Sequence, residues 1–228
     1  MKEATSETSV DCLTEIHARI AAAAKLPRRN ADDIHLIAVS KTRAADEIEP
    51  LILAGHRLFG ENRVQEAASK WPELKAKYDD IRLHLIGQLQ SNKADEAVAI
   101  FDSIHSVDRL SLITALGKAM REQDKQVPCF LQVNIGAEDQ KGGCSVAQIG
   151  DLLGAARDNN VPISGLMCIP PALLEPAPFF ALLAELAARH GLTDLSMGMS
   201  DDFETAIMLG ANYIRVGTAL FGERSSGI

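Results

Sequence analysis

Two short apolar runs flank a segment of helix length in DLSMGMSDDFETAIMLGANYIRVGTALF, residues 194–221. The runs at 194–199 and 213–221 suit buried strands, and the segment 201–210 suits a helix. A connection of this length joins parallel strands. The stretch therefore predicts a strand, a helix and a second strand parallel to the first.

The same alternation continues towards the N-terminus and gives a count of eight strands. Earlier strands are predicted at 34–41, 58–62, 81–87, 103–108, 128–136 and 163–169. Helices are predicted from about 44, up to about 78, from about 91, and over 109–123, 145–159 and 177–190. Eight strands fit a doubly wound sheet or a closed barrel, but IAVSKTRAADEI lacks the glycine fingerprint that often follows the first strand of such a sheet. We predict an α/β fold, a single (β/α)8 TIM barrel.

An extra helix is predicted before the barrel. Residues 6–24 place apolar side chains at three- and four-residue spacing, as in one face of a helix. These are Val10, Leu13, Ile16, Ile20 and Ala24. We therefore expect residues 1–30 to form an N-terminal helix and loop that pack on a barrel domain of residues 31–228.

Composition narrows the class of partner. The 228 residues carry a formal charge of −8, from 23 basic and 31 acidic side chains, which disfavours binding to a phosphate backbone. The start, MKEATSETSVDC, lacks an apolar signal core, and no apolar run reaches the roughly 20 residues that span a bilayer. The four cysteines lie far apart in the sequence, which disfavours a disulfide framework and suits a protein of a reducing compartment. We expect a cytoplasmic protein with no nucleic-acid or membrane partner.

Lys41 is the first candidate site residue, because it closes an apolar strand where barrel proteins place their function. A partly desolvated ammonium at a barrel mouth favours the neutral amine, which can attack a carbonyl. Equally, the side chain could extend to solvent at a strand end. Lys41 alone does not decide between these readings.

The loops after the last two strands predict a phosphate site, which barrels often build there. Gly198 and Gly217 allow close backbone approach, Ser200 and Thr218 add hydroxyl groups, and a helix near Asp201 would supply amides. Taken singly, Ser200 or Asp201 could cap that helix and Gly217 could relieve crowding. Their convergence on neighbouring strands favours the phosphate site.

Arg215 lies two residues before Gly217, so the two point to the same side of the last strand. An inward guanidinium needs acceptors for its hydrogen bonds. An acidic side chain could supply them, but with a lysine and a phosphate site on the same rim we favour a ring nitrogen of a bound ligand.

Other reactive residue types are assigned no role. His84 and His105 lie within strands and are predicted to be core or rim residues, since no further ligand falls at metal spacing. Cys144 follows KGG in a loop and could be a reactive thiol, but with no adjacent base it is predicted to be only a small side chain. We predict no metal site.

Several motifs in order resemble the pyridoxal phosphate homeostasis protein family, single-domain relatives of the alanine racemase N-terminal barrel. They span residues 34–224 and read IAVSKTR, FGENRVQE, HLIGQLQSNK, VNIG with KGG, GLMCIPP, LSMGMSDDFETAI and YIRVGTALFGER. The resemblance implies a barrel that binds pyridoxal 5′-phosphate (PLP), with no established turnover and a role in vitamin B6 balance. We expect a monomer, with apo PLP-dependent enzymes as candidate recipients of the cofactor.

The resemblance also implies the role of each site residue. Lys41 would form a Schiff base with the cofactor, and Arg215 would donate to the pyridine nitrogen. Asn62 would lie near the ring, although a turn or cap role is the alternative. The phosphate would be held by Ser200, Gly217 and Thr218.

Three functions use such a site: a PLP carrier, a PLP-dependent amino acid racemase, and a cofactor-free Schiff-base aldolase. Racemisation needs a second base, which the racemases take from a tyrosine of an added domain. The tyrosines here are Tyr78, expected to be exposed near a helix end, and Tyr213, expected on the side opposite the barrel mouth. An aldolase has no use for an arginine facing a pyridine ring. We therefore expect a carrier rather than an enzyme.

Overall fold

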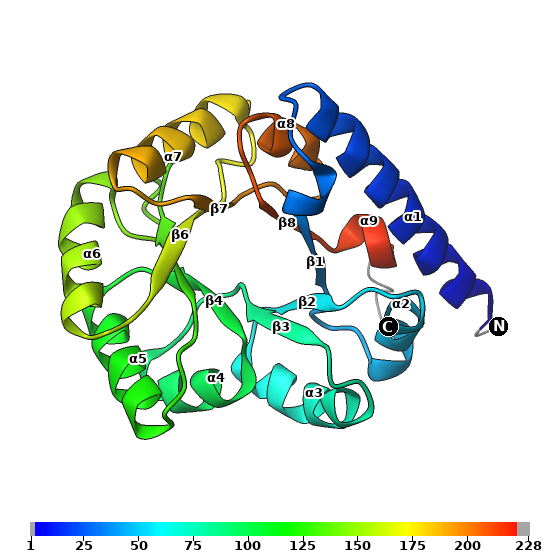
Figure 1. The fold of residues 1–228 in the computed structure, drawn as a ribbon, viewed down its shortest axis with the longest axis horizontal. Coiled ribbons are helices and arrows are strands. Elements are labelled where there is room, and N and C mark those ends of the chain that lie inside the picture. The colour runs from blue at the N-terminus through cyan, green and yellow to red at the C-terminus, as the bar shows by residue number, and fades with distance from the viewer. Residues whose placement is uncertain (1–2, 223–228) are drawn as a thin grey trace.

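The computed structural model describes residues 3–222, with side chains from residue 9 onward, and shows a closed barrel of eight parallel strands in sequence order. Helices surround the barrel on the outside (Figure 1). The strands are β1 (His35–Val39), β2 (Leu58–Glu61), β3 (Arg82–Leu85), β4 (Ser103–Val107), β5 (Cys129–Val133), β6 (Ile163–Cys168), β7 (Asp194–Ser196) and β8 (Tyr213–Val216). The prediction of a (β/α)8 barrel is confirmed.

Nine α-helices occur within residues 3–222. They are α1 (Glu3–Lys25), α2 (Ala45–Leu53), α3 (Val64–Lys77), α4 (Ala94–Ile100), α5 (Leu110–Glu122), α6 (Ile149–Asp158), α7 (Ala177–Arg189), α8 (Phe203–Met208) and α9 (Thr218–Phe221). Single 3-10 turns precede β1, α4 and α6, at Ala31–Asp33, Ser91–Lys93 and Val146–Gln148.

Helix α1 is the extra helix and packs against α2, α8 and α9 on the outside of the barrel (Figure 1). Its buried apolar stripe includes Leu13, Ile16, Ile20 and Ala24, as the spacing predicted. Val10 is only half-buried. Residues 1–2 and 223–228 of the expected domains lie outside the described residues.

The last strand is shorter than predicted. A strand over 213–221 was expected, but β8 ends at Val216 and Thr218–Phe221 form α9. Gly217 causes the change, because its ψ of −70° takes the backbone out of the extended region. The apolar run continues through this turn, so its pattern did not show where the strand ends.

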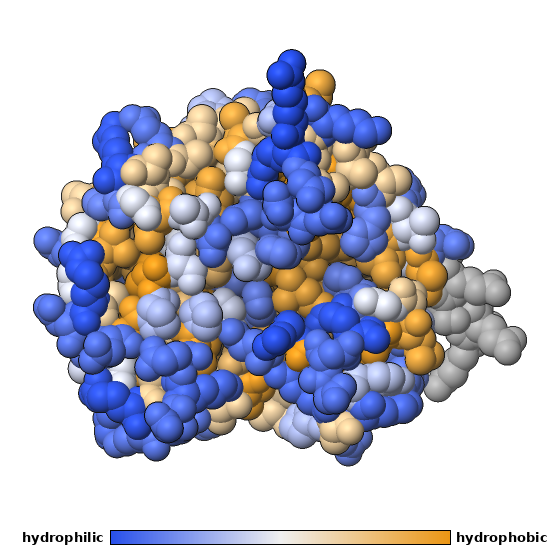
Figure 2. All heavy atoms as spheres, in the orientation of Figure 1, coloured by the Kyte–Doolittle hydropathy of each residue, from blue (hydrophilic) through white to orange (hydrophobic). Residues whose placement is uncertain are grey.

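The outer helices lie in the segments between strands, and most strand residues are buried. On the surface, hydrophilic residues project around the outline, with hydrophobic residues between them (Figure 2). The largest buried side chains include Trp71, Phe59 and Phe101. Among the described helices, none is both long and apolar enough to cross a membrane. The barrel thus fixes the strand ends on which the site is built.

Candidate functional site

A cavity of about 500 Å³ opens at the C-terminal ends of the strands. This volume lies within the ~300 to 1,000 Å³ typical of small-molecule sites. The cavity is lined by all six predicted site residues: Lys41, Asn62, Ser200, Arg215, Gly217 and Thr218. The fold therefore brings together residues that lie up to 177 positions apart in the sequence.

Lys41 lies in the turn that follows β1. Its side chain is partly buried and has no hydrogen bond or ion pair with any residue in the described part of the chain. The next residue, Thr42, has a φ of 62°, in the left-handed region that β-branched residues rarely occupy. Such a conformation persists only where surrounding contacts hold it.

Those contacts come from Lys70 of α3, whose side chain is 8% exposed. Its ammonium donates to the carbonyl oxygens of Ser40 (2.9 Å) and Arg43 (3.0 Å), which flank Lys41 and Thr42. The ammonium also lies 2.7 Å from the carboxylate of the fully buried Glu61. The backbone of the turn that carries Lys41 is thus held by hydrogen bonds from a buried ammonium group.

Two carboxylates complete this arrangement. Glu61 Oε1 accepts hydrogen bonds from Ser40 Oγ (2.7 Å) and from Trp71 Nε1 (3.0 Å). Glu66 accepts the backbone amide of Thr42 and pairs with Lys70 at 3.2 Å. Every residue from Ser40 to Arg43 except Lys41 itself is therefore held by this network, which leaves the Lys41 amine free to react.

Asn62 follows β2 and lies beside Gly87. A Cβ on Gly87 would come within 2.2 Å of the Asn62 carbonyl oxygen, so only glycine permits this approach. Residue Arg63, not Asn62, is the N-cap of α3, and it makes no capping bond. The cap alternative for Asn62 is therefore wrong, but the residue does lie in the turn between β2 and α3, and it lines the cavity.

Arg215 points into the barrel, as predicted, and is 5% exposed. Its Nη1 donates to the carbonyl oxygen (2.8 Å) and Oγ (2.6 Å) of Ser196, and its Nη2 donates to the carbonyl oxygen of Cys168 (2.8 Å). The acidic partner considered as an alternative is not found, because no carboxylate in residues 9–222 pairs with this guanidinium. Burial lowers the pKa of Arg215, yet a guanidinium stays charged in proteins.

The guanidinium has donors to spare. Three of its five N–H groups are used by Ser196 and Cys168, and the Nε–H and one Nη2–H have no acceptor among the described residues. Because Arg215 also lines the cavity, a ligand there meets a buried positive charge with unused donors.

The expected phosphate region is built from turns rather than from one long helix. Gly198 has a φ of 92°, and a Cβ there would lie 2.6 Å from that of Ala206. Asp202 accepts the amide of Met199 at 2.6 Å and so shapes the turn that presents Ser200. Neither Ser200 nor Asp201 is the N-cap of α8, which begins at Phe203.

Gly217 and Thr218 face this turn from the start of α9. A Cβ on Gly217 would lie 3.3 Å from Val39 Cβ, so crowding does explain part of the need for glycine. Helices α8 and α9 have only six and four residues. The helix predicted over 201–210 is confirmed, but it begins two residues later than expected, at Phe203. Local hydroxyl and amide groups, not a strong helix dipole, are what this region offers to an anion.

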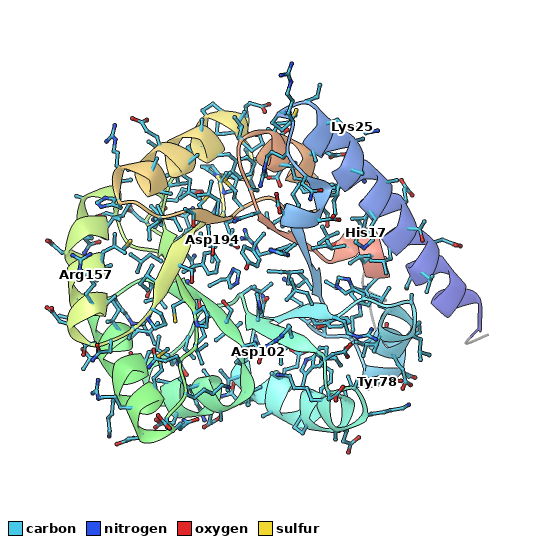
Figure 3. The ribbon with its side chains drawn as sticks, in the orientation of Figure 1. His17, Lys25, Tyr78, Asp102, Arg157 and Asp194 are labelled. Atoms are coloured by element: carbon cyan, nitrogen blue, oxygen red, sulfur yellow. The ribbon has the colours of Figure 1, made fainter. Side chains whose placement is uncertain are left out.

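The two tyrosines lie away from the cavity. Tyr213 starts β8 and lines a second cavity at the opposite end of the barrel, together with Asp102 and Asp194 (labelled in Figure 3). Tyr78 lies at the end of α3, away from the barrel axis (Figure 3). It was expected to be exposed, but it is half-buried because it packs against the core, and its hydroxyl bonds Glu49 at 2.8 Å.

His84 and His105 were predicted to be core or rim residues, and the structure places them in the core together with Cys144. His84 and His105 are buried inside the barrel and bonded to each other. Burial raises the pKa of the Cys144 thiol to about 11, which makes it a poor nucleophile. All four cysteines are free. Within residues 9–222 no cluster of three or more potential metal ligands occurs.

Arg43 lines the cavity and was not singled out from the sequence. It bonds the carbonyl oxygen of Gly222 at 2.7 Å and pairs with Glu47 at 3.1 Å, so it joins the Lys41 turn to the end of α9. The only signal in the sequence was its place two residues after Lys41.

Comparison with known families defines the class of protein. The model of the family described as "Alanine racemase, N-terminal domain" matches residues 13–225. This match and the barrel fold place the chain in the alanine racemase N-terminal domain class. Two curated relatives, each called "Pyridoxal phosphate homeostasis protein", come from Pseudomonas aeruginosa (40% identity, 96% of this chain and 97% of the relative) and Synechocystis sp. (41%, 84% and 92%). The chain belongs to the pyridoxal phosphate homeostasis protein family.

Solved structures agree with this assignment. PipY of Synechococcus elongatus PCC7942, described with PLP bound, is 40% identical with a TM-score of 0.76, and the match covers 89% of this chain and all of PipY. An alanine racemase of Clostridium difficile 630 has a TM-score of 0.71 at 13% identity, and the match covers 96% of this chain but 58% of the racemase. The second likeness concerns the fold alone.

The buried pair behind Lys41 gives a prediction about stability. Lys70→Met should cost about 3 to 5 kcal/mol, because it leaves the Glu61 carboxylate buried without its cation. The double variant Lys70→Met with Glu61→Gln should recover part of this loss. Lys118→Met breaks an exposed pair with Glu122 and should cost at most about 1 kcal/mol. Urea unfolding of the four proteins measures the free energies. Equal costs for Lys70→Met and Lys118→Met would show that the buried pair does not hold the turn.

Proposed function

We propose that this chain binds PLP in the cavity at the C-terminal ends of the strands, and that it stores and delivers the cofactor rather than turning over a substrate. The observation that carries the proposal is Arg215, a buried guanidinium with neutral partners and unused donors, in the same cavity as the free amine of Lys41. PipY, a relative in the same family, is described with PLP bound.

The residues of the cavity fit each part of this cofactor. Lys41 supplies an amine for the aldehyde, and the network around Lys70 holds its backbone in place. Arg215 supplies donors to the pyridine nitrogen. Ser200, Gly217 and Thr218 supply hydroxyl and amide groups to the phosphate, and Asn62 lies near the ring. When bound, PLP supplies an electron sink for amino acid chemistry.

The charge on Arg215 supports a carrier more than an enzyme. A guanidinium donor keeps the ring nitrogen unprotonated, which weakens the electron sink on which turnover depends. A racemase would also need a second base near the bound amino acid. Neither Tyr78 nor Tyr213 lines the cavity, so neither can be that base.

Further parts of the proposal concern setting and partners. A carrier of a reactive aldehyde would act in the cytoplasm, as a monomer, and would pass PLP to apo PLP-dependent enzymes. The net charge of −8 supports the view that nucleic acid is not a partner.

Lys41→Ala should abolish the visible absorbance of the PLP-loaded protein and make the cofactor dialysable, because the covalent link is lost while the phosphate contacts remain. Lys118→Ala, an exposed lysine of α5, is the matched control and should keep the absorbance. A spectrum after borohydride reduction and dialysis checks both variants. If Lys41→Ala retains the wild-type band after reduction, another lysine holds the cofactor.

Ser200→Ala combined with Thr218→Val should weaken PLP binding without unfolding the barrel. Each lost hydrogen bond to a charged group is worth roughly 1.5 to 3 kcal/mol, or about one to two decades of affinity per site. Titration of apo protein with PLP measures the dissociation constant. An unchanged constant would place the phosphate elsewhere.

PLP-loaded wild-type protein should racemise alanine or serine far more slowly than the median enzyme rate of about 10 per second. Chiral chromatography of L-alanine incubated with the protein measures this rate. Formation of D-alanine at a rate near that median, lost in Lys41→Ala, would favour the racemase alternative.

A further inference from the structure

A chain of hydrogen bonds runs through the barrel interior from Arg215 to the opposite end. Arg215 Nη1 lies 2.6 Å from Ser196 Oγ, Ser196 Oγ lies 2.8 Å from His105 Nδ1, and His105 Nε2 lies 3.0 Å from His84 Nδ1. We name these four residues the interior column. His84 lines the second cavity, and Arg215 lines the first, so the column connects the two ends of the barrel.

The surroundings of the column leave it few alternative partners. Ser196 and His105 are fully buried, and the His105 ring stacks on Phe130 at 4.1 Å between ring centres. Tyr213 meets the same ring edge-on at 5.7 Å. The imidazole is therefore clamped in one orientation, with one nitrogen towards Ser196 and the other towards His84.

The chemistry of the first residue fixes the direction of every bond in the column. A guanidinium can only donate, so Ser196 Oγ accepts from Arg215. Apart from Arg215, His105 Nδ1 is the only group bonded to this hydroxyl among the described residues. The hydroxyl proton therefore goes to His105 Nδ1, because a buried hydroxyl without an acceptor is costly.

The direction of the Ser196–His105 bond also fixes which nitrogen of each histidine carries the proton. His105 accepts at Nδ1, so its own proton lies on Nε2 and is donated to His84 Nδ1. His84 in turn carries its proton on Nε2, towards the second cavity. Both rings are neutral: burial lowers the pKa of His84 to about 4, and burial with the nearby Arg215 charge lowers that of His105.

We propose that Ser196 and His105 are positioning residues for Arg215, which hold its guanidinium through a directed column of neutral groups and so keep its charge and free donors for the ring nitrogen of PLP. This inference rests on the proposed function. A carboxylate at the Ser196 position would hold the arginine equally well, but it would neutralise the charge on the guanidinium. The column anchors Arg215 without that loss.

The first test measures the column in the protein without cofactor. Full-length chain labelled with ¹⁵N-histidine should show His105 and His84 as neutral rings with the proton on Nε2 at neutral pH. A His105 ring with its proton on Nδ1 would reverse the direction of the column and overturn the proposal. This readout does not depend on PLP, so it stands even if the chain fails to bind the cofactor.

The second test uses a matched pair of buried serines. Ser106 follows His105 in β4, is fully buried, and its Oγ has no partner in the described structure. Ser196→Ala should disturb the histidine protonation pattern and weaken PLP binding by about tenfold, whereas Ser106→Ala should change neither. Equal PLP affinities for the two variants would show that Ser196 does not position Arg215.

The third test separates positioning from packing at His105. His105→Phe keeps an aromatic ring against Phe130 but removes the acceptor for Ser196, and it should weaken PLP binding as Ser196→Ala does. His105→Asn restores an acceptor and should bind PLP within about threefold of wild type. If both variants are folded and bind equally well, His105 has a packing role only. Absence of PLP binding by the wild type would instead refute the proposed function.

Discussion

The structure depends on one costly arrangement, a guanidinium buried inside a barrel without an ion pair to any carboxylate of residues 9–222. Burying a charge is unfavourable unless its hydrogen bonds are satisfied, and here the barrel supplies two carbonyl oxygens and one hydroxyl to Arg215. These neutral acceptors hold the group in place without a direct ion pair, and the carboxylate of Asp202 offsets its positive charge only through space. Under the proposed function, a pyridine nitrogen would supply the lone pair that the unused N–H groups lack.

The turn after the neighbouring strand β1 solves a different problem, that of holding a lysine backbone while leaving its amine free. Lys70, Glu61 and Glu66 bond the residues on both sides of Lys41 and maintain the left-handed Thr42 between them. These charged groups contact the turn and not the Lys41 amine. A buried ion pair adds little net stability, so its value here is that the turn has one conformation.

Much of the fold could be predicted from the sequence. Eight short apolar runs alternate with segments of helix length, and connections of this kind join parallel strands with one handedness. Lys41, Ser200, Arg215 and Gly217 could be placed on one rim because the ends of parallel strands share one edge of the barrel. The interior column could not be predicted, since Ser196 and His105 lie 91 positions apart and their contact depends on barrel register. The early end of β8 was missed because a single ψ angle at Gly217 decides it.

The central claim is that Arg215 keeps the ring nitrogen of PLP unprotonated. The most direct measurement is the ¹⁵N chemical shift of the pyridine nitrogen in the chain loaded with ¹⁵N-labelled PLP. We expect the shift of a neutral, hydrogen-bonded pyridine at neutral pH in the wild type, and a change towards pyridinium in Arg215→Glu, with folding of the variant checked separately. A pyridinium shift in the wild-type protein would contradict the account.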